Sequence, residues 1–188
     1  LMKILLLSAM FFLPSTYASG WESKDLNKLL GSMSCESCEL THVNLVKTDL
    51  RAAQLSGANL SEARLMYSSL IGASMGNVNL SKSDLRGANL FHANLIGADL
   101  SGADLRGANM VGTKLTAANL SGANLGGVNL YGADLGYAKL YEANFQNAFL
   151  FNANFRHAKH NGTPWESASR CATILPNGAV SNKHCTDQ

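Results

Sequence analysis

Large apolar residues recur at every fifth position along most of this chain. From Leu40 to Phe155 all 24 such positions are apolar, and 20 of them are leucine. Two residues before each of these positions stands a small residue, which is alanine in 16 of the 24 cases. Asparagine or aspartate usually comes directly before the large residue, and glycine is frequent two residues after it. The chain is therefore built from a tandem five-residue repeat.

A period of five excludes a straight helix and a flat strand. In a helix, successive leucines would advance by about 140° and scatter around the axis. In a strand they would alternate between the two faces, because five is odd. The pattern works if the chain turns once per repeat, so that the large and the small residue both point inward from a short extended piece. Glycine, asparagine and aspartate then fall at the corners, which they favour.

A slower period of 20 predicts how many repeats complete one turn of a coil. The sequence RGAN occurs at 86–89 and again at 106–109, and serine follows the central leucine at 61, 81, 101 and 121. Four repeats per turn explain both observations, because residues 20 apart then stack directly. Stacked turns pair about 4.8 Å apart, like neighbouring strands. The 24 repeats therefore predict about six turns.

The repeat resembles the consensus A(D/N)LxG of the pentapeptide-repeat family over residues 38–160. This resemblance implies an all-β fold, a right-handed quadrilateral β-helix with leucine at the inner centre and alanine beside it. We divide the chain into a signal peptide (1–18), an N-terminal capping segment (19–37), the repeat solenoid (38–160) and a C-terminal cap (161–188).

Both ends of such a solenoid need covers, because the end turns expose unpaired backbone and core leucines. Before the repeats, the sequence SKDLNKLLG predicts a short helix over the first turn. Ser23 is its expected N-cap, and Gly31 is expected to end it. The expected apolar face consists of Leu26, Leu29 and Leu30. After the repeats, the turn sequence at 176–178, Pro-Asn-Gly, predicts a hairpin that serves as a lid.

The four cysteines fall in two pairs near the two ends of the repeat region. Cys35 and Cys38 lack the helix start of a redox site, the histidine of a haem site and the four ligands of a metal site, which leaves a structural disulfide or buried thiols. A disulfide between Cys171 and Cys185 would stabilise the hairpin by about 3 kcal/mol. Pairing within each end is favoured, because the rod is longer than any disulfide. Both elements look like those of exported bacterial pentapeptide-repeat proteins.

The N-terminus has the pattern of a secretory signal. Lys3 precedes a predominantly apolar run over 4–13, and small residues lead to a cleavage site near Ala18. The run is too short to span a bilayer. We therefore expect a periplasmic or secreted protein, with no membrane attachment after cleavage. The 15 basic and 13 acidic residues, for a net charge of +2, also argue against a nucleic-acid partner.

No pattern of catalytic, cofactor-binding or metal-binding residues emerges from the sequence, so we expect no enzyme, no cofactor and no metal. His157 and His160 lie three residues apart and could be read as a metal pair, but we interpret them as polar residues at the end of the solenoid. Charged residues that recur at a spacing of 20 predict a solvated ladder instead of an acid/base pair: Asp84, Arg86, Asp104 and Arg106.

One outward column is unusual because it is apolar. This column consists of the residues that directly follow each central residue on the face that begins at Leu50, and Phe149 flanks it. The apolar residues of the column, together with Phe149, are Ile71, Phe91, Val111, Tyr131, Phe149 and Phe151. Stacking between turns would steady this face. Contiguous apolar patches also mark contact surfaces. The column is therefore either a packing feature or the place where a protein partner or a second copy binds.

These expectations lead to a non-enzymatic exported scaffold that binds an unknown protein partner or itself. The alternative rests on the resemblance, since some pentapeptide-repeat proteins resemble duplex DNA and shield DNA gyrase. Over 38–160 the chain has 10 basic and 8 acidic residues, so its net charge has the sign opposite to that of DNA. The predicted signal peptide would also carry the protein away from gyrase.

Overall fold

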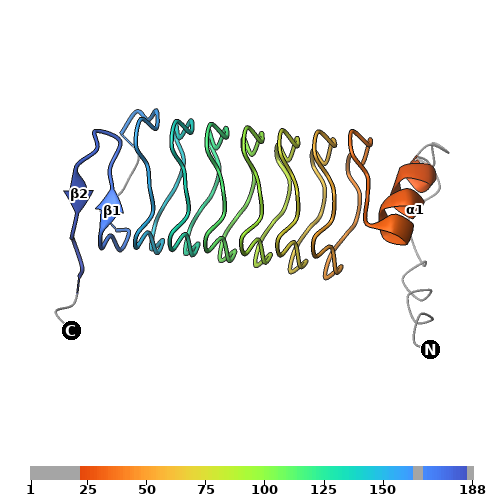
Figure 1. Ribbon diagram of the computed structural model, residues 1–188, viewed down its shortest axis with the longest axis horizontal. Coiled ribbons are helices and arrows are strands. Elements are labelled where there is room, and N and C mark those ends of the chain that lie inside the picture. The colour runs from red at the N-terminus through yellow and green to blue at the C-terminus, as the bar shows by residue number, and fades with distance from the viewer. Residues whose placement is uncertain (1–21, 163–166, 186–188) are drawn as a thin grey trace.

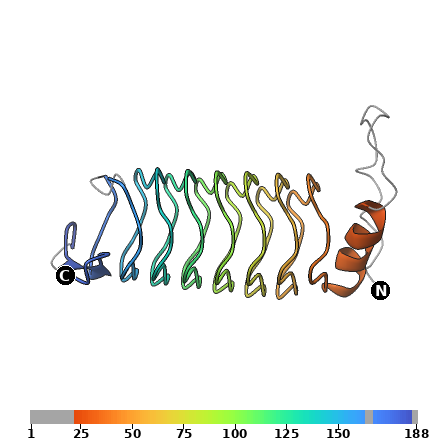
Figure 2. The same ribbon diagram turned by 90° about the horizontal axis from the view of Figure 1, so that it is seen from above.

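The fold is a solenoid of stacked turns, seen in a computed structural model that describes residues 22–162 and 167–185 (Figure 1). The predicted signal peptide, 1–18, lies outside the described residues. Within these ranges, one helix, α1 (Glu22–Ser32), stands at the N-terminal end, and two short strands, β1 (Thr173–Ile174) and β2 (Val180–Ser181), stand at the C-terminal end. Figure 1 and Figure 2, which are two views at right angles, both show an elongated rod. No helix in the described ranges is long and apolar enough to cross a bilayer.

Successive turns are joined by parallel bridges between residues 20 apart, as the slower sequence period predicts. Asn89, for example, bridges Ser69 on one side and Asn109 on the other. The N–H of Leu90 donates to the carbonyl of Asn109 at 2.7 Å, and the N–H of Asn109 donates to the carbonyl of Ala88 at 2.9 Å. Residues at each repeat position therefore form a column along the rod. We number the four faces by their first central residue: Leu40, Leu45, Leu50 and Leu55.

The interior is filled by the residues that the five-residue period marks as large and small. All central residues from Leu40 to Phe155 are buried, and Leu40, the most exposed of them, exposes 2% of its surface. Where a buried hydroxyl replaces alanine, it bonds to the backbone, as Ser68 Oγ does to the carbonyl of Leu65 at 2.8 Å. Thr113 Oγ1 likewise donates to the carbonyl of Leu90 at 2.9 Å. The core is therefore apolar apart from hydroxyls that have partners.

The corners use a left-handed residue two places after each central residue. Glycine occupies many of these places, as predicted; the φ angle of Gly107, for instance, is +64°. Larger residues adopt the same conformation, including Tyr67 at +57° and Tyr137 at +59°. The left-handed conformation costs a non-glycine residue about 1–2 kcal/mol. Glycine is thus favoured at the corner without being required, because the packed interior imposes the turn.

Helix α1 covers the first turn with part of its predicted apolar face. Leu29 is fully buried and Leu26 packs against the core, whereas Leu30 is 44% exposed. The expected N-cap, Ser23, lies inside the helix, which begins at Glu22. Gly31 also lies inside it, and the chain adopts the left-handed conformation at Met33. These boundary predictions were wrong by one or two residues, which is the usual scatter at helix ends, where the last turn frays or tightens.

The first turn has no preceding turn to accept its backbone hydrogen bonds, and α1 supplies part of the replacement. Asp25 Oδ2 accepts the N–H of Glu39 at 3.0 Å. The carbonyl of Met33 accepts the N–H of Gln54 at 2.8 Å. The capping segment therefore satisfies polar groups of the end turn as well as covering its leucines.

The C-terminal segment continues the register of 20 although the leucine pattern has stopped. Ser169 bridges Phe149, and Ile174 of β1 bridges Asn154, both in parallel. Strand β2 then pairs antiparallel with β1, with Ile174 opposite Val180. At the predicted Pro-Asn-Gly turn, Gly178 has a φ of +83° and donates its N–H to the carbonyl of Leu175 at 2.8 Å.

Both cysteine pairs are disulfides, which confirms the predicted pairing. Cys35 bonds to Cys38 beside α1, and Cys171 bonds to Cys185 across the C-terminal hairpin. No free cysteine remains in the described part of the chain. Each end of the rod is therefore closed by a local covalent link as well as by packing.

Candidate interaction surfaces

The apolar column on the third face lies on the outside of the rod, as its pentad position requires. Phe91 is 37% exposed, Tyr131 is 48% exposed and Phe149 is 50% exposed. The other members are half-buried: Ile71, Val111 and Phe151. We call these six residues the third-face stripe. Its first and last members are four turns apart, which corresponds to about 19 Å at the spacing of paired strands.

An asparagine column runs beside the third-face stripe and orders its backbone. The Oδ1 atoms of Asn89, Asn109 and Asn129 each accept the N–H of the stripe residue two places later, at 3.2, 3.3 and 3.1 Å. Asn109 Nδ2 also donates to Asn89 Oδ1 at 3.2 Å. The ring of Phe91 contacts that of His92 edge-on, with centroids 4.1 Å apart. The stripe therefore sits on a rigid support.

The third face carries no ionic charge over most of its length. Its outward positions between Ser69 and Asn152 hold no aspartate, glutamate, lysine or arginine. Each of the other faces has charged outward residues in the same turns, such as Asp99, Arg86 and Lys114. An aromatic surface that lacks charge has the composition found at the centre of protein interfaces.

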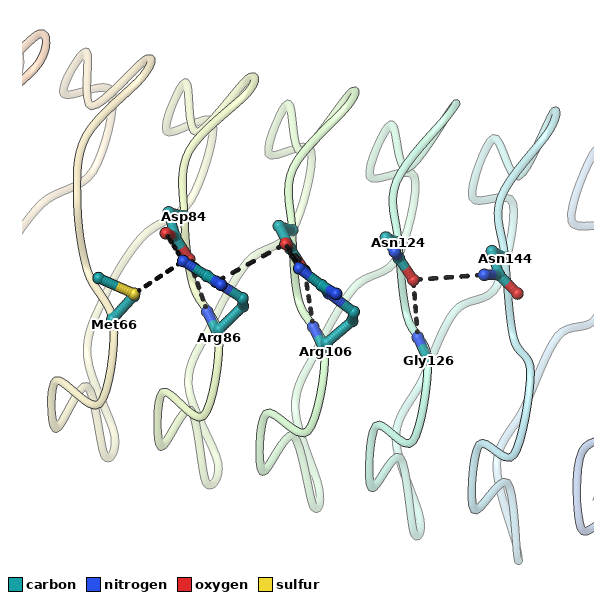
Figure 3. Close-up of polar contacts among 8 residues, drawn as sticks. Met66, Asp84, Arg86, Arg106, Asn124, Gly126 and Asn144 are labelled. Carbon is teal, nitrogen blue, oxygen red and sulfur yellow. Dashed lines mark hydrogen bonds and ion pairs between the residues drawn. The ribbon is translucent and has the colours of Figure 1, made fainter.

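The second face carries the predicted ladder of charge, and Figure 3 shows its hydrogen bonds and ion pairs. Arg86 binds Asp84 in a bidentate way, with Nε–Oδ1 at 2.8 Å and Nη2–Oδ2 at 2.7 Å. Arg106 binds Asp104 in the same way, at 2.9 and 2.6 Å. Arg86 Nε also lies 3.7 Å from Asp104 Oδ2, so the ladder links two turns.

The ladder extends beyond its four charged residues. On one side, Arg86 Nη2 approaches Met66 Sδ at 3.1 Å. On the other side, Asn124 Oδ1 accepts the N–H of Gly126 at 3.2 Å and Nδ2 of Asn144 at 3.4 Å (Figure 3). The sequence period predicted the columns but not the contact with Met66, which depends on how the arginine side chain leans toward the preceding turn.

The pairing in the ladder shifts its protonation equilibria. The hydrogen bond from the Arg86 side chain lowers the pKa of Asp84, and that from Arg106 lowers the pKa of Asp104. The hydrogen bond to Asp84 in turn raises the pKa of Arg86. Each carboxylate is therefore held in its charged form by its own guanidinium. A pair of mutually neutralised groups does not form an acid/base couple, which agrees with the interpretation from sequence.

Aromatic side chains at the corners add contacts that the sequence reading did not single out. The ring of Tyr67 lies over Gly87, so that a Cβ at Gly87 would come within 2.6 Å of the ring. The ring of His92 covers Gly112 in the same manner, with a corresponding distance of 2.5 Å. A bulky corner residue followed 20 positions later by glycine is the sequence signal that would have revealed both contacts.

Two groups that resemble metal sites have other roles. Asp25, Cys35 and Cys38 lie close together, but the two sulfur atoms form a disulfide and the Asp25 carboxylate accepts the N–H of Glu39. His157 stacks on Tyr137, with ring centroids 4.9 Å apart, as part of the fourth face. The first group therefore lacks the free ligand atoms that a metal ion needs, and the second arrangement contributes only a single imidazole.

The comparisons with known proteins agree on one family. The family model described as pentapeptide repeats matches in eight copies, at residues 34–66, 68–107, 83–122 and 108–147. The match covers more than half of the chain and follows the columns described above. A search of curated protein sequences finds no significant match.

Several solved structures are similar to this chain. HetL, a pentapeptide repeat protein involved in heterocyst differentiation regulation from the cyanobacterium Nostoc, is 25% identical, with 83% of this chain and 97% of HetL covered and a TM-score of 0.49. Rfr23, a pentapeptide repeat protein from the cyanobacterium Cyanothece, is 23% identical, with coverage of 78% and 97% and a TM-score of 0.34. QnrB1, a plasmid-mediated fluoroquinolone resistance protein, is 19% identical, with coverage of 68% and 82% and a TM-score of 0.38.

Proposed function

This chain belongs to the pentapeptide-repeat family, and we propose that it is a non-enzymatic, exported scaffold that binds a protein through its third face. The observation that carries the proposal is the exposure of aromatic side chains on a stretch of this face, between Ser69 and Asn152, that has no ionic charge. Tyr131 and Phe149 each expose about half of their surface there, at 48% and 50%. Burying such rings against a partner stabilises a complex, at about 25 cal/mol per Å² of apolar surface.

A filled interior supports a role in binding over a role in catalysis. The columns of leucine and alanine occupy the centre of the solenoid, and Leu85, Leu90 and Leu105 expose none of their surface. Catalytic sites need a concave, water-excluding pocket in which reacting groups converge. A rod with a solid core instead offers flat, regular faces, which suit recognition of another surface.

The disulfides support export. All four cysteines are paired, in two local links at the two ends of the rod. Disulfides persist in oxidising compartments such as the periplasm and the extracellular space, and they are rare in the cytosol. The sequence pattern over 1–18 supports the same conclusion. We therefore propose a periplasmic or secreted location.

We infer three finer features of the architecture on the same basis. Membership of the family favours a right-handed winding of the turns. The 24 pentads, at four per turn, correspond to six complete turns. The hairpin of β1 and β2 acts as a lid, because β2 pairs with the exposed edge of β1, and an uncovered edge would be open to strand addition.

The alternative function, protection of DNA gyrase by a DNA mimic, has weaker support. A DNA mimic requires a strongly negative surface, whereas the repeat region has two more basic than acidic residues. The carboxylates of the second-face ladder are neutralised by Arg86 and Arg106. A gyrase supercoiling assay with the mature protein tests this alternative directly, and protection from an inhibitor would favour it over the scaffold.

The proposed function is tested with a double variant of the third-face stripe, Phe91→Ser with Tyr131→Ser. We expect it to keep the fold by circular dichroism and to lose self-association in sedimentation velocity, or capture of a partner from the exported fraction, by tenfold or more. The matched control is Ile96→Ser, since Ile96 is 43% exposed at the same pentad position on the fourth face. Unchanged behaviour of the double variant in both assays would refute the proposal.

A further inference from the structure

We propose that the third face is self-complementary, and that two copies of this chain pack face to face through it with their rods antiparallel. The proposal rests on the proposed function, since it takes the third-face stripe as the contact surface and names the partner as a second copy. It follows from three properties of the face: its lack of charge, the order of large and small side chains along it, and its asparagine column.

The lack of charge allows the third face to meet a copy of itself. The three outward columns of this face hold fifteen residues between Ser69 and Asn152, and none of them is aspartate, glutamate, lysine or arginine. A face that meets its own copy brings like groups together, and like charges across an interface cost several kcal/mol. The second face, with its arginine and aspartate columns, has no such neutral stretch. The third face is thus suited to self-association.

A two-fold axis between two antiparallel rods determines which residues meet. When the axis lies in the interface and is perpendicular to the rods, each column faces its own copy and the order of the turns is reversed. With the axis at the turn of Val111, Ile71 faces Phe151, Phe91 faces Tyr131, and Val111 faces itself. This register brings all fifteen uncharged positions into the contact and leaves the ion pair of Asp49 and Arg51 outside it.

In the two columns that flank the apolar column, large side chains then lie over small ones. In the asparagine column, Phe149 faces Ser69 of the second copy. Phe149 is 50% exposed and stands at the end of a column that elsewhere has the shorter serine and asparagine side chains. In the corner column, His92 faces Gly132 in the same way. The face therefore has a projection at one end and a matching recess at the other, as an isologous interface requires.

A parallel arrangement lacks this complementarity. A two-fold axis along the rods would place the asparagine column of one copy against the apolar column of the other at the same height. Phe149 would then face Phe151, and Asn89 would face Phe91. Burying amide groups against rings leaves their hydrogen bonds unmade, at a cost of roughly 1–3 kcal/mol each. The antiparallel arrangement is favoured for this reason.

The asparagine column supplies polar contacts across the antiparallel interface. The Oδ1 atoms of Asn89 and Asn129 already accept backbone N–H groups of the stripe. In the described ranges, the Nδ2 group of neither residue has an acceptor within hydrogen-bonding distance. Asn89 of one copy faces Asn129 of the other, so the Nδ2 group of Asn89 can donate to Asn129 Oδ1 across the interface. An amide carbonyl has two lone pairs, and that of Asn129 has one left, whereas Asn89 Oδ1 already accepts both the N–H of Phe91 and Nδ2 of Asn109.

The small size of the face favours a weak, reversible dimer. Fifteen outward residues a side is fewer than the 20–30 residues, about 800 Å² per partner, of a standard interface. We therefore expect a dimer that forms with increasing concentration and dissociates on dilution. Such a contact is compatible with a reversible assembly of exported rods.

The first experiment measures self-association of the mature chain, with both disulfides intact, by sedimentation velocity over a concentration series. Val111→Lys places two like charges together at the axis and should raise the dissociation constant at least tenfold. The matched control is Ser101→Lys, at the same pentad position in the same turn but on the first face, which should leave it unchanged. Circular dichroism checks that both variants keep the fold.

The second experiment tests which residues face each other. Ile71→Asp and Phe151→Lys should each weaken the dimer, and the two together should restore it, because Asp at 71 then faces Lys at 151 of the second copy. Ile71→Asp combined with Tyr131→Lys places the new charges one turn out of register and should not restore it. A double variant at 71 and 151 as weak as its single variants would overturn the proposed arrangement.

The outcomes separate this proposal from the proposed function. A wild-type chain that stays monomeric at every concentration overturns the dimer, as does a dimer that Val111→Lys leaves unchanged. If the chain is monomeric and the stripe variants still lose capture of another protein, the scaffold function stands and its partner is not a second copy. If the stripe variants lose neither self-association nor capture of another protein, both proposals fail.

Discussion

The second and third faces of the rod have the same backbone and the same kind of interior, but opposite exteriors. Beneath the second face lie Leu85 and Leu105, and beneath the third lie Leu90 and Met110, all with no exposed surface. Outside, the second face carries paired guanidinium and carboxylate groups, whereas the third carries aromatic rings and amides. The comparison shows that the inward residues specify the fold and leave the outward columns free to specify function.

The two exteriors also differ in what they leave available for binding. On the second face, Arg86 and Arg106 bond to carboxylates of their own face, so their charge is largely satisfied within the chain. On the third face, Tyr131 and Phe149 keep about half of their surface in water. Contact with a partner therefore brings more new apolar burial to the third face.

The largest expected effect is the difference in stability between inward and outward substitutions on the two faces. Leu85→Ala and Leu90→Ala each remove a fully buried side chain, and each should lower the free energy of unfolding by about 2–5 kcal/mol. The outward neighbours Arg86→Ser and Phe91→Ser should each cost less than about 1 kcal/mol, as exposed substitutions usually do. Urea unfolding followed by circular dichroism measures all four. An outward substitution as costly as an inward one would break the separation of fold and function.

A smaller effect is expected where an outward side chain crosses between turns. Gly87 and Gly107 occupy equivalent corners of the second face, with φ angles of +62° and +64°. A Cβ at Gly87 would lie 2.6 Å from the ring of Tyr67, whereas a Cβ at Gly107 has no neighbour within 4 Å. Gly107→Ala should cost about 1 kcal/mol from left-handed strain, and Gly87→Ala roughly 1 kcal/mol more, from crowding.

Tyr67→Ala provides the control for this pair of substitutions. In its background the ring is absent, so Gly87→Ala and Gly107→Ala should have equal effects on the midpoint of thermal unfolding. A difference that persists without the ring would mean that backbone strain, and not the contact with Tyr67, distinguishes the two corners.

The interior and the columns could be predicted from the sequence because they depend on position alone. Once the chain turns every five residues, Leu90 must be buried and Asp84 must stack on Asp104. The ends could not be predicted as well, because they depend on contacts that no repeat encodes. Leu30 is exposed although it follows the apolar pattern of the helix. Arg170 occupies a central position in the C-terminal register where leucine would be expected, yet the bridges at Ser169 and Ile174 continue.

The smallest expected effect concerns the dependence of stability on pH, which should distinguish the two exteriors. The pKa values of Asp84 and Asp104 are lowered in the folded state. Their pairing therefore stabilises the fold above the pKa of an unfolded aspartate, about 3.9, and this stabilisation is lost as the pH falls through the folded pKa. The side chains of the arginine partners, Arg86 and Arg106, are substantially exposed, at 42% and 52%, so the contribution should stay below about 1 kcal/mol.

The double variant Asp84→Asn with Asp104→Asn should lose less stability than the wild type between pH 6 and pH 3. Asn89→Ala, in the stretch of the third face between Ser69 and Asn152 that has no carboxylate, should leave that pH dependence unchanged. An equal loss in the aspartate variant and the wild type would show that the ladder, for all its short hydrogen bonds, contributes no more to the fold than the uncharged face does.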